Sequence, residues 1–327
     1  MALIKGKAIQ YSASGILISR GYRLTDKEGN YKVNDKKYAL PSRFALTRRF
    51  LRAEITSFYS IDNGDQLAIA KKGFFIRKRG SIFFDKSFSM PRGSKPLNLC
   101  FAPSGNIYFG EYFQNINKQA VNIYRSEDNA QTWQVAYTFS AGEINHVHGL
   151  FFDIYTNRIW VATGDRENEC IIGYTEDEFK TFKEVFRGGQ EYRTCQLFFY
   201  KDFIVFGTDT QYEQNVIKRF DRKTLEIITL QEVQGSVIKG GQVGDVAFIS
   251  TTVEPSTVNT DKYAHLWVTK DGLHWEERYK AKKDWLPHIF QFGTFEFPQY
   301  NVEKIDRLYF SGRALKGLDG KTTYIDL

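Results

Sequence analysis

Four polar segments recur at a regular interval along the chain and decide how the rest of it is interpreted. They begin at Ser126 (SEDNAQTW), Thr175 (TEDEFKTF), Phe220 (FDRKTLEI) and Thr269 (TKDGLHW), which gives intervals of 49, 45 and 49 residues. Short apolar runs flank each segment, a pattern typical of a turn between two strands. A repeating unit of about 40–50 residues that holds four short strands is typical of a propeller blade.

The composition agrees with a strand-rich chain. Of 327 residues, 16% are aromatic and only 7 are proline, a balance that favours strands. Runs such as Ile107–Tyr112, Arg158–Thr163 and Phe203–Thr208 are short, β-branched and aromatic, and each is bounded by Gly, Asp or Asn. The sequence predicts a short helix near residues 43–52 and no other helix.

We therefore predict a single all-β domain over residues 1–327, a six-bladed β-propeller of four-stranded antiparallel blades. The predicted blades span residues 53–92, 95–140, 144–187, 192–233, 236–281 and 287–327. Because the last blade is one strand short, the N-terminal strand within Ile4–Arg20 is expected to complete it and close the ring. Residues 21–41 are interpreted as a hairpin decoration, and the alternative is that they begin a seventh blade.

The segment Ser126–Trp133 resembles the Asp-box, also called the BNR repeat, of sialidase-like propellers. Its Ser and Asp oxygens are suited to accept backbone N–H bonds in a tight turn, and its Trp to fill the space between blades. Ala130 stands where the family has Gly, Phe179 does so in the second copy, and the copy at Thr269 is shortened. The resemblance implies the fold rather than a reaction.

A wider part of the chain, residues 50–327, resembles uncharacterised Asp-box proteins associated with bacterial polysaccharide gene clusters. The matching stretches are Gly110–Tyr112, His146–Gly149, Ile159–Asp165, Thr251–Pro255 and Lys283–Asp284. That resemblance implies a carbohydrate-related role. Neuraminidase activity is not expected, because the chain lacks the Arg-Ile-Pro segment of sialidases and no arginine triad is assignable.

The charge and the cysteine content restrict the classes of ligand and the compartment that we expect. The net charge is +7, but the basic residues are spread thinly, so we expect an anionic small molecule or glycan rather than nucleic acid. No apolar run is long enough to span a membrane. The N-terminus turns charged too early for a secretory signal, and the three cysteines have no metal-binding spacing. These features predict a cytoplasmic protein without a cofactor, and leave a protein partner open.

Propeller geometry indicates where a site would lie. The residues that open each inner strand and those that close the next strand meet at one mouth of the central channel, so polar residues at these positions are candidates. Candidate catalytic residues are His146, His148, Asp165 and Tyr192. Candidate substrate-binding residues are Glu111, Arg193, Asp209, Glu254, His288, Gln291 and Arg313.

His146 and His148 lie two residues apart and so share one face of a strand. Three interpretations stay open: two hydrogen-bonded channel histidines, a proton-transfer role, or a metal pair. A metal would need a third ligand such as His288 or Asp165, and no compact motif supports one. We therefore assign no metal at this point.

The function expected from these residues is action on, or binding of, an acidic glycan at the channel mouth. A hydrolase would use paired carboxylates, whereas a uronate lyase would use a His or Tyr base with a cation beside the sugar carboxylate. The alternative is a non-catalytic propeller that binds a glycan or a protein.

Overall fold

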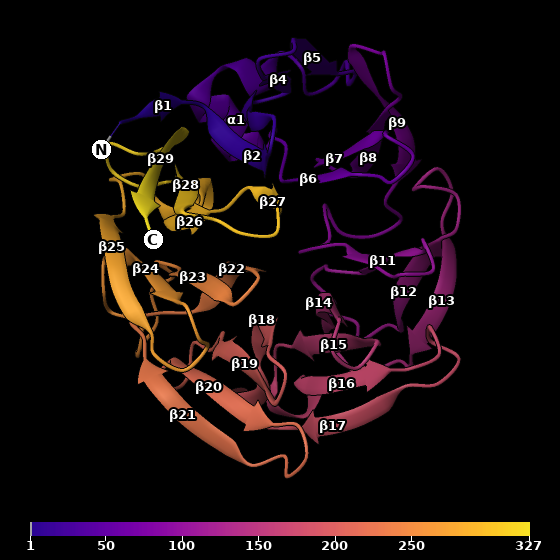
Figure 1. The fold of residues 1–327 in the computed structure, drawn as a ribbon, viewed down its shortest axis with the longest axis vertical. Helices are drawn as coiled ribbons and strands as arrows, with labels where there is room; N and C mark the ends of the chain where they lie inside the picture. Colours follow the sequence, from indigo (N-terminus) through magenta and orange to yellow (C-terminus); the bar gives the residue numbers. More distant parts are fainter. Residues whose placement is uncertain (1) are drawn as a thin grey trace.

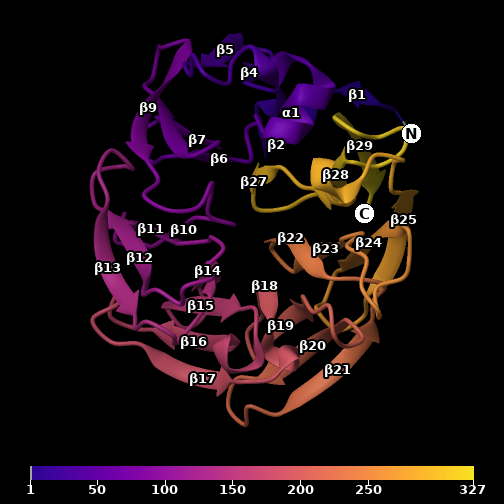
Figure 2. The same cartoon turned by 180° about the vertical axis from the view of Figure 1, so that it is seen from behind.

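The chain folds into a ring of antiparallel sheets around a central channel, and the computed structural model describes residues 2–327 (Figure 1). The inner strand of each sheet faces the channel and the outer strand lies at the rim. Seen from behind, the ring keeps the two chain ends close together (Figure 2). The architecture is that of a β-propeller, as the sequence predicts. Within the described residues, no helix has the length and apolar character needed to cross a bilayer.

Four four-stranded antiparallel meanders follow one another through the middle of the chain. The first is β10 (Cys100–Phe101), β11 (Ile107–Gly110), β12 (Val121–Ser126) and β13 (Gln134–Phe139). The second is β14 (His146–Asp153), β15 (Arg158–Gly164), β16 (Ile171–Thr175) and β17 (Lys183–Arg187). The third is β18 (Thr194–Phe199), β19 (Phe203–Thr208), β20 (Val216–Asp221) and β21 (Ile227–Glu232). The fourth is β22 (Val237–Val243), β23 (Val246–Thr251), β24 (Tyr263–Thr269) and β25 (Glu276–Lys282).

The two chain ends share a sheet. Its strands are β26 (Thr294–Glu296), β28 (Arg307–Arg313), β29 (Lys321–Asp326) and, on the outside, β1 (Ile4–Lys5). Ile4 pairs with Thr322 and Lys5 with Lys321. The N-terminal segment thus supplies the missing fourth strand, as predicted.

The predicted count of six blades is not confirmed, because the N-terminal residues form a further meander. Its strands are β2 (Lys7–Ser12), β3 (Gly15–Arg20), β4 (Arg23–Thr25) and β5 (Asn30–Val33). It merges with β6 (Ser57–Ser60), β7 (Gln66–Ala70), β8 (Gly73–Arg77), β9 (Phe83–Ser89) and β27 (Gln299–Asn301) into one nine-stranded sheet. Residues 21–41, interpreted from sequence as a decoration, contribute β4 and β5 to this sheet.

Helical structure is short. Helix α1 (Ala45–Leu51) confirms the helix predicted near residues 43–52. The 3-10 turns are η1 (Pro41–Arg43), η2 (Glu167–Glu169), η3 (Gln190–Tyr192) and η4 (His288–Phe290).

The core lies between neighbouring sheets, where aromatic side chains interlock. Trp133 follows the first repeated turn, and its ring lies 5.1 Å from that of Phe74 on β8 and 4.8 Å from that of Phe109 on β11. One side chain therefore packs two adjacent sheets together. Edge contacts between aromatic rings of this kind add to the free energy of burial.

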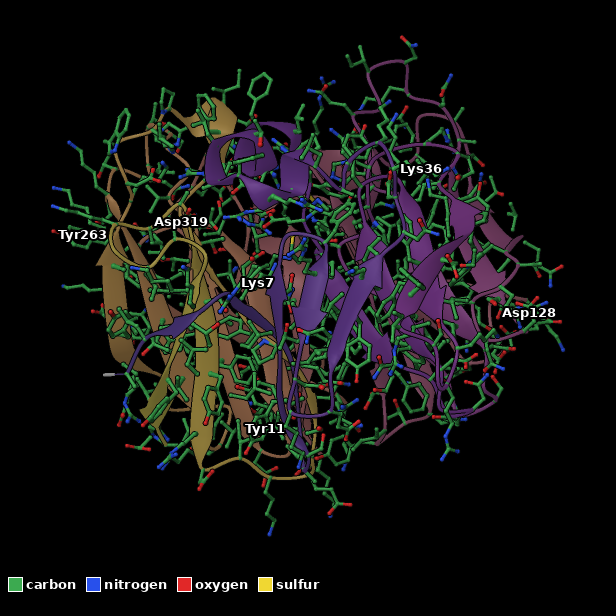
Figure 3. The ribbon with its side chains drawn as sticks, turned by 90° about the horizontal axis from the view of Figure 1, so that it is seen from above. Lys7, Tyr11, Lys36, Asp128, Tyr263 and Asp319 are labelled. Atoms are coloured by element: carbon green, nitrogen blue, oxygen red, sulfur yellow. The ribbon has the colours of Figure 1, made fainter. Side chains whose placement is uncertain are left out.

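Three of the four repeated turns, those that begin at Ser126, Thr175 and Thr269, share one hydrogen-bond pattern, and Figure 3 labels Asp128 of the first at the outer rim. Asp128 accepts the backbone N–H groups of Gln131 and Thr132, and Ser126 Oγ accepts that of Ala130. Ala130 has φ of 66°, in the left-handed region that favours glycine. The side-chain oxygens hold the turn in this conformation without the glycine.

A buried ion pair joins the second and third meanders. Asp153, at the end of β14, is fully buried and accepts two hydrogen bonds from Arg222, of 2.5 and 3.1 Å. Arg222 lies in the turn after β20 and is largely buried. Removing one partner of such a pair leaves an uncompensated buried charge.

We expect Arg222→Met to lower the free energy of unfolding by about 3–5 kcal/mol, because Asp153 would keep a buried negative charge without its cation. The matched control is Arg187→Met, which removes a half-exposed pair with Glu184 and should cost about 0–1 kcal/mol. Urea unfolding of both variants measures the difference. Equal losses would show that the Asp153–Arg222 pair has no special role.

Candidate functional site

A cavity of about 340 Å³ opens at one mouth of the channel, between the ends of the inner strands. Its charged lining comprises six cations and four carboxylates. They are Arg52, Lys71, Lys95, Arg193, Lys239 and Arg313, with Glu54, Asp165, Asp209 and Glu254. A second cavity, towards the other mouth, shares Thr56, Leu97 and Lys239 with the first, so Lys239 lies between the two.

His146 and His148 lie on β14, where the strand is irregular. The register of β14 on β15 shifts between Val147 and Gly149, which leaves His148 in a bulge. His148 lies against Gly164 of β15, where a Cβ atom would come within 2.4 Å of the imidazole. Glycine at this position thus makes room for the ring beside Asp165.

The two imidazoles are held by backbone carbonyl groups. His146 Nδ1 lies 2.9 Å from the Phe113 oxygen and His148 Nδ1 lies 3.0 Å from the Thr194 oxygen. Since a carbonyl oxygen only accepts, each Nδ1 carries a hydrogen and donates it. The Nε2 atoms face one another at 3.1 Å, and Asp165 Oδ1 lies 3.1 Å from that of His148 and 3.4 Å from that of His146.

Asp165 also connects the histidines to a buried arginine. Arg193 Nη2 lies 3.0 Å from Asp165 Oδ1 and 3.7 Å from Asp209 Oδ2. Burial opposes ionisation of Asp165, but the neighbouring histidines outweigh it and hold the pKa of this carboxyl well below its usual range. The buried Arg193 Nε and Asp209 Oδ1 have no hydrogen-bond partner among residues 2–327. Such orphaned polar atoms favour a bound ligand or water.

Glu254 provides a titratable acid on the cavity wall. Burial, and then the negative charge of Asp209, raise its pKa to about 7. Its Oε1 atom accepts a hydrogen bond of 2.8 Å from Gln211. Near neutral pH this carboxyl is therefore divided between its protonated and ionised forms, as a general acid or base requires.

A cationic cluster surrounds one buried carboxylate, Glu296, which lines the second cavity and not the first. Glu296 pairs with Lys7 at 2.6 Å and, in a short contact, with Arg313. Burial and the charge of Arg313 hold the pKa of Lys95 well below its usual value. Burial also lowers the pKa of Lys239, to about 8, and Arg313 and Lys7 oppose its charge. In Figure 3, Lys7 and Tyr11 lie at different heights along the axis of the ring.

The structure brings most of the predicted site residues together. Those that line the cavity are Asp165, Arg193, Asp209, Glu254, Gln291 and Arg313, and His146 and His148 lie directly behind Asp165. The geometric rule that strand openings and strand ends converge at the channel mouth accounts for all of them.

Besides the two histidines behind Asp165, three predicted residues lie away from the cavity. Tyr192 stacks on Phe186 at 5.2 Å and belongs to the core between sheets. Glu111 is buried and pairs with Arg92 while accepting the backbone N–H of Asn122. His288 lies in η4 and lines a separate surface cavity. Each sits near a strand end, but its side chain points into a core, an ion pair or a surface loop.

Sequence reasoning identified Arg313 but missed Lys7, Lys95, Lys239 and Glu296 of the cationic cluster, as well as Tyr112. Lys239 lies on the inner strand β22, so the rule that selected Gln291 also applies to it. Lys95 precedes β10 in a loop, where no strand pattern marks it. Tyr112 follows β11, and its ring lies 4.3 Å from that of His146.

No family model matches the chain, and no curated protein matches it. Among solved structures, it is similar to a chain of the mitotic checkpoint complex, with a TM-score of 0.55 and 10% identity over 98% of this chain and 89% of that one. It is also similar to the GH74 xyloglucanase of Xanthomonas campestris, with a TM-score of 0.55 and 12% identity. That match covers 84% of this chain and 46% of the xyloglucanase chain. Likeness at such identity shows the fold alone.

We expect Asp209→Asn to lower the pKa of Glu254 from about 7 towards its ordinary value, because it removes the negative charge that opposes ionisation of Glu254. Carbon-13 NMR titration of the glutamate side chains measures the shift. Asp177→Asn, in a turn at the rim, is the control and should leave Glu254 unchanged. An unaltered titration in the Asp209 variant would contradict this electrostatic coupling.

Proposed function

We propose that the cavity at the channel mouth binds an acidic glycan through its carboxylate and catalyses cleavage of a glycosidic bond in it. The observation that carries the proposal is the excess of cations on the cavity wall. Six basic side chains and four carboxylates line the cavity, and Lys95, Lys239 and Arg313 also lie close to the buried carboxylate of Glu296, while Arg313 pairs with Glu54 as well. A bound anion would offset this repulsion.

The uncharged polar residues of the cavity are suited to bind the hydroxyl groups of a sugar. Hydroxyl groups both donate and accept hydrogen bonds, and the cavity presents both kinds of partner. Its uncharged polar residues are Thr56, Ser94, Tyr112, Gln211, Thr252, Gln291 and Thr294. A volume of about 340 Å³ lies within the range of ligand-binding pockets.

Glu254 is the group that we assign as the proton donor. In both a hydrolase and a uronate lyase, the leaving glycosidic oxygen takes up a proton. A carboxyl group with a pKa of about 7 holds that proton near neutral pH.

We expect wild-type protein to bind uronate- or sialate-containing oligosaccharides more tightly than neutral ones, and Lys239→Met to weaken that binding at least about tenfold through loss of a charge-assisted contact. Calorimetric titration measures both affinities. The matched control is Lys201→Met, in the exposed turn between β18 and β19. Equal binding of neutral glycans, or wild-type affinity in the Lys239 variant, would refute the assigned site.

Turnover of a bound glycan should fall as the pH rises through about 7, because Glu254 then loses the proton that it donates. Glu254→Gln should keep the affinity and lower turnover by about 100-fold or more. Mass spectrometry of the products measures turnover. Binding without any product in the wild type would establish the alternative, a non-catalytic glycan-binding propeller.

A further inference from the structure

We propose that His146, His148 and Asp165 bind one divalent transition-metal ion of the Zn²⁺ class beside the channel-mouth cavity. The three ligand atoms are the two Nε2 atoms and Asp165 Oδ1, which lie 3.1–3.4 Å from one another. Zinc bonds of about 2.0–2.1 Å at tetrahedral angles separate neighbouring ligand atoms by about 3.3 Å. The observed triangle therefore has the size that such an ion requires.

The orientation of the imidazoles is suited to a cation between them. Each Nδ1 donates to a backbone carbonyl group, so in a neutral ring the lone pair lies on Nε2. Two lone pairs then face each other at 3.1 Å with a carboxylate oxygen beside both. A metal ion at the centre turns this repulsion into attraction, and Nδ1–H groups held by carbonyl oxygens are the usual support of metal-binding histidines.

The local backbone is shaped to hold this triangle. The bulge at His148 turns its ring to the side of His146, and Gly164 leaves the space that this ring occupies. His146 and His148 are 5% and 1% exposed, so their position is set by packing rather than by solvent. Rigid support of this kind favours a preformed metal site.

One side of the triangle is open to the cavity. The side chain of Asp165 is 34% exposed and lines the cavity wall. A metal held there keeps a coordination position for water or a ligand oxygen, as catalytic zinc sites with three protein ligands do. Two imidazoles and one carboxylate also suit Fe²⁺ or Mn²⁺, whereas Mg²⁺ and Ca²⁺ prefer oxygen ligands alone.

The positive charge of Arg193 lies close to the proposed metal position and opposes the charge of the metal ion. Its Nη2 atom lies 3.0 Å from the same Asp165 oxygen. Asp209, 3.7 Å from Arg193, offsets the guanidinium charge. Cys195 is not a ligand in this assignment: its thiol donates to Asp209, and burial raises its pKa well above the usual value.

The test is titration of chelator-treated protein with Zn²⁺ and, separately, with Co²⁺, whose visible spectrum reports its coordination. We expect one equivalent to bind, and His146→Gln, His148→Gln and Asp165→Asn each to weaken affinity by about 100-fold or more. The control His265→Gln should bind as the wild type does. His265 is also buried and touches two carboxylates, Asp261 and Glu277, but through opposite ring nitrogens. Cys195→Ser should bind normally.

Two results would overturn the site. One is wild-type protein that binds neither ion at a stoichiometric level. The other is a nitrogen-15 NMR spectrum in which both imidazoles carry hydrogens on both nitrogens at pH 7.5 and added Zn²⁺ changes nothing. Thermal melting of each variant confirms that the propeller is folded. The titration contains no glycan, so its failure would not count against the proposed glycan site, nor would failure of that site count against this one.

Discussion

The closure of the ring is the constraint on which the rest of the structure depends. A propeller leaves two open edges until its first and last strands pair. Here Ile4 and Lys5 pair with Thr322 and Lys321, and the Thr322 hydroxyl group donates to the Gly6 carbonyl oxygen at 2.8 Å. The contact spans almost the whole chain, so closing it costs chain entropy that only the shared burial of neighbouring sheets can offset.

Closure also determines the electrostatics of the channel. Lys7 follows the closing strand directly and meets Glu296, near the other end of the chain, at 2.6 Å. Arg313 from β28 and Lys239 from β22 face the same carboxylate. Removing so many charges from water is costly unless they are paired. Concentrated positive charge near the channel therefore supports the anionic ligand proposed above.

The two proposed sites at the channel mouth are built from different parts of the chain. The metal site comes from neighbouring strands of a single meander, since His146, His148 and Asp165 belong to β14 and the end of β15. The cationic wall comes from opposite ends of the chain. Glu254, Asp209 and Asp165 line the same cavity as Lys239 and Arg313, so a glycan carboxylate held by the cations would leave its sugar ring in the cavity beside these acids. Metal and proton donor would then act on one ligand.

The sequence by itself determined that the chain repeats short antiparallel strands joined by turns, because turn residues and apolar runs are local signals, but it did not determine how many blades they form. It also identified His146, His148, Asp165 and Arg193, since strand ends in a propeller converge by rule. The N-terminal meander escaped it, because β4 is short and because β5, besides pairing with β4, joins distant β9 in a parallel pair that no local pattern marks. Tyr192, Glu111 and the cluster around Glu296 were decided by tertiary structure alone. Whether a side chain faces the channel, a core or an ion pair depends on strand register and on partners up to 300 residues away, which no local pattern encodes.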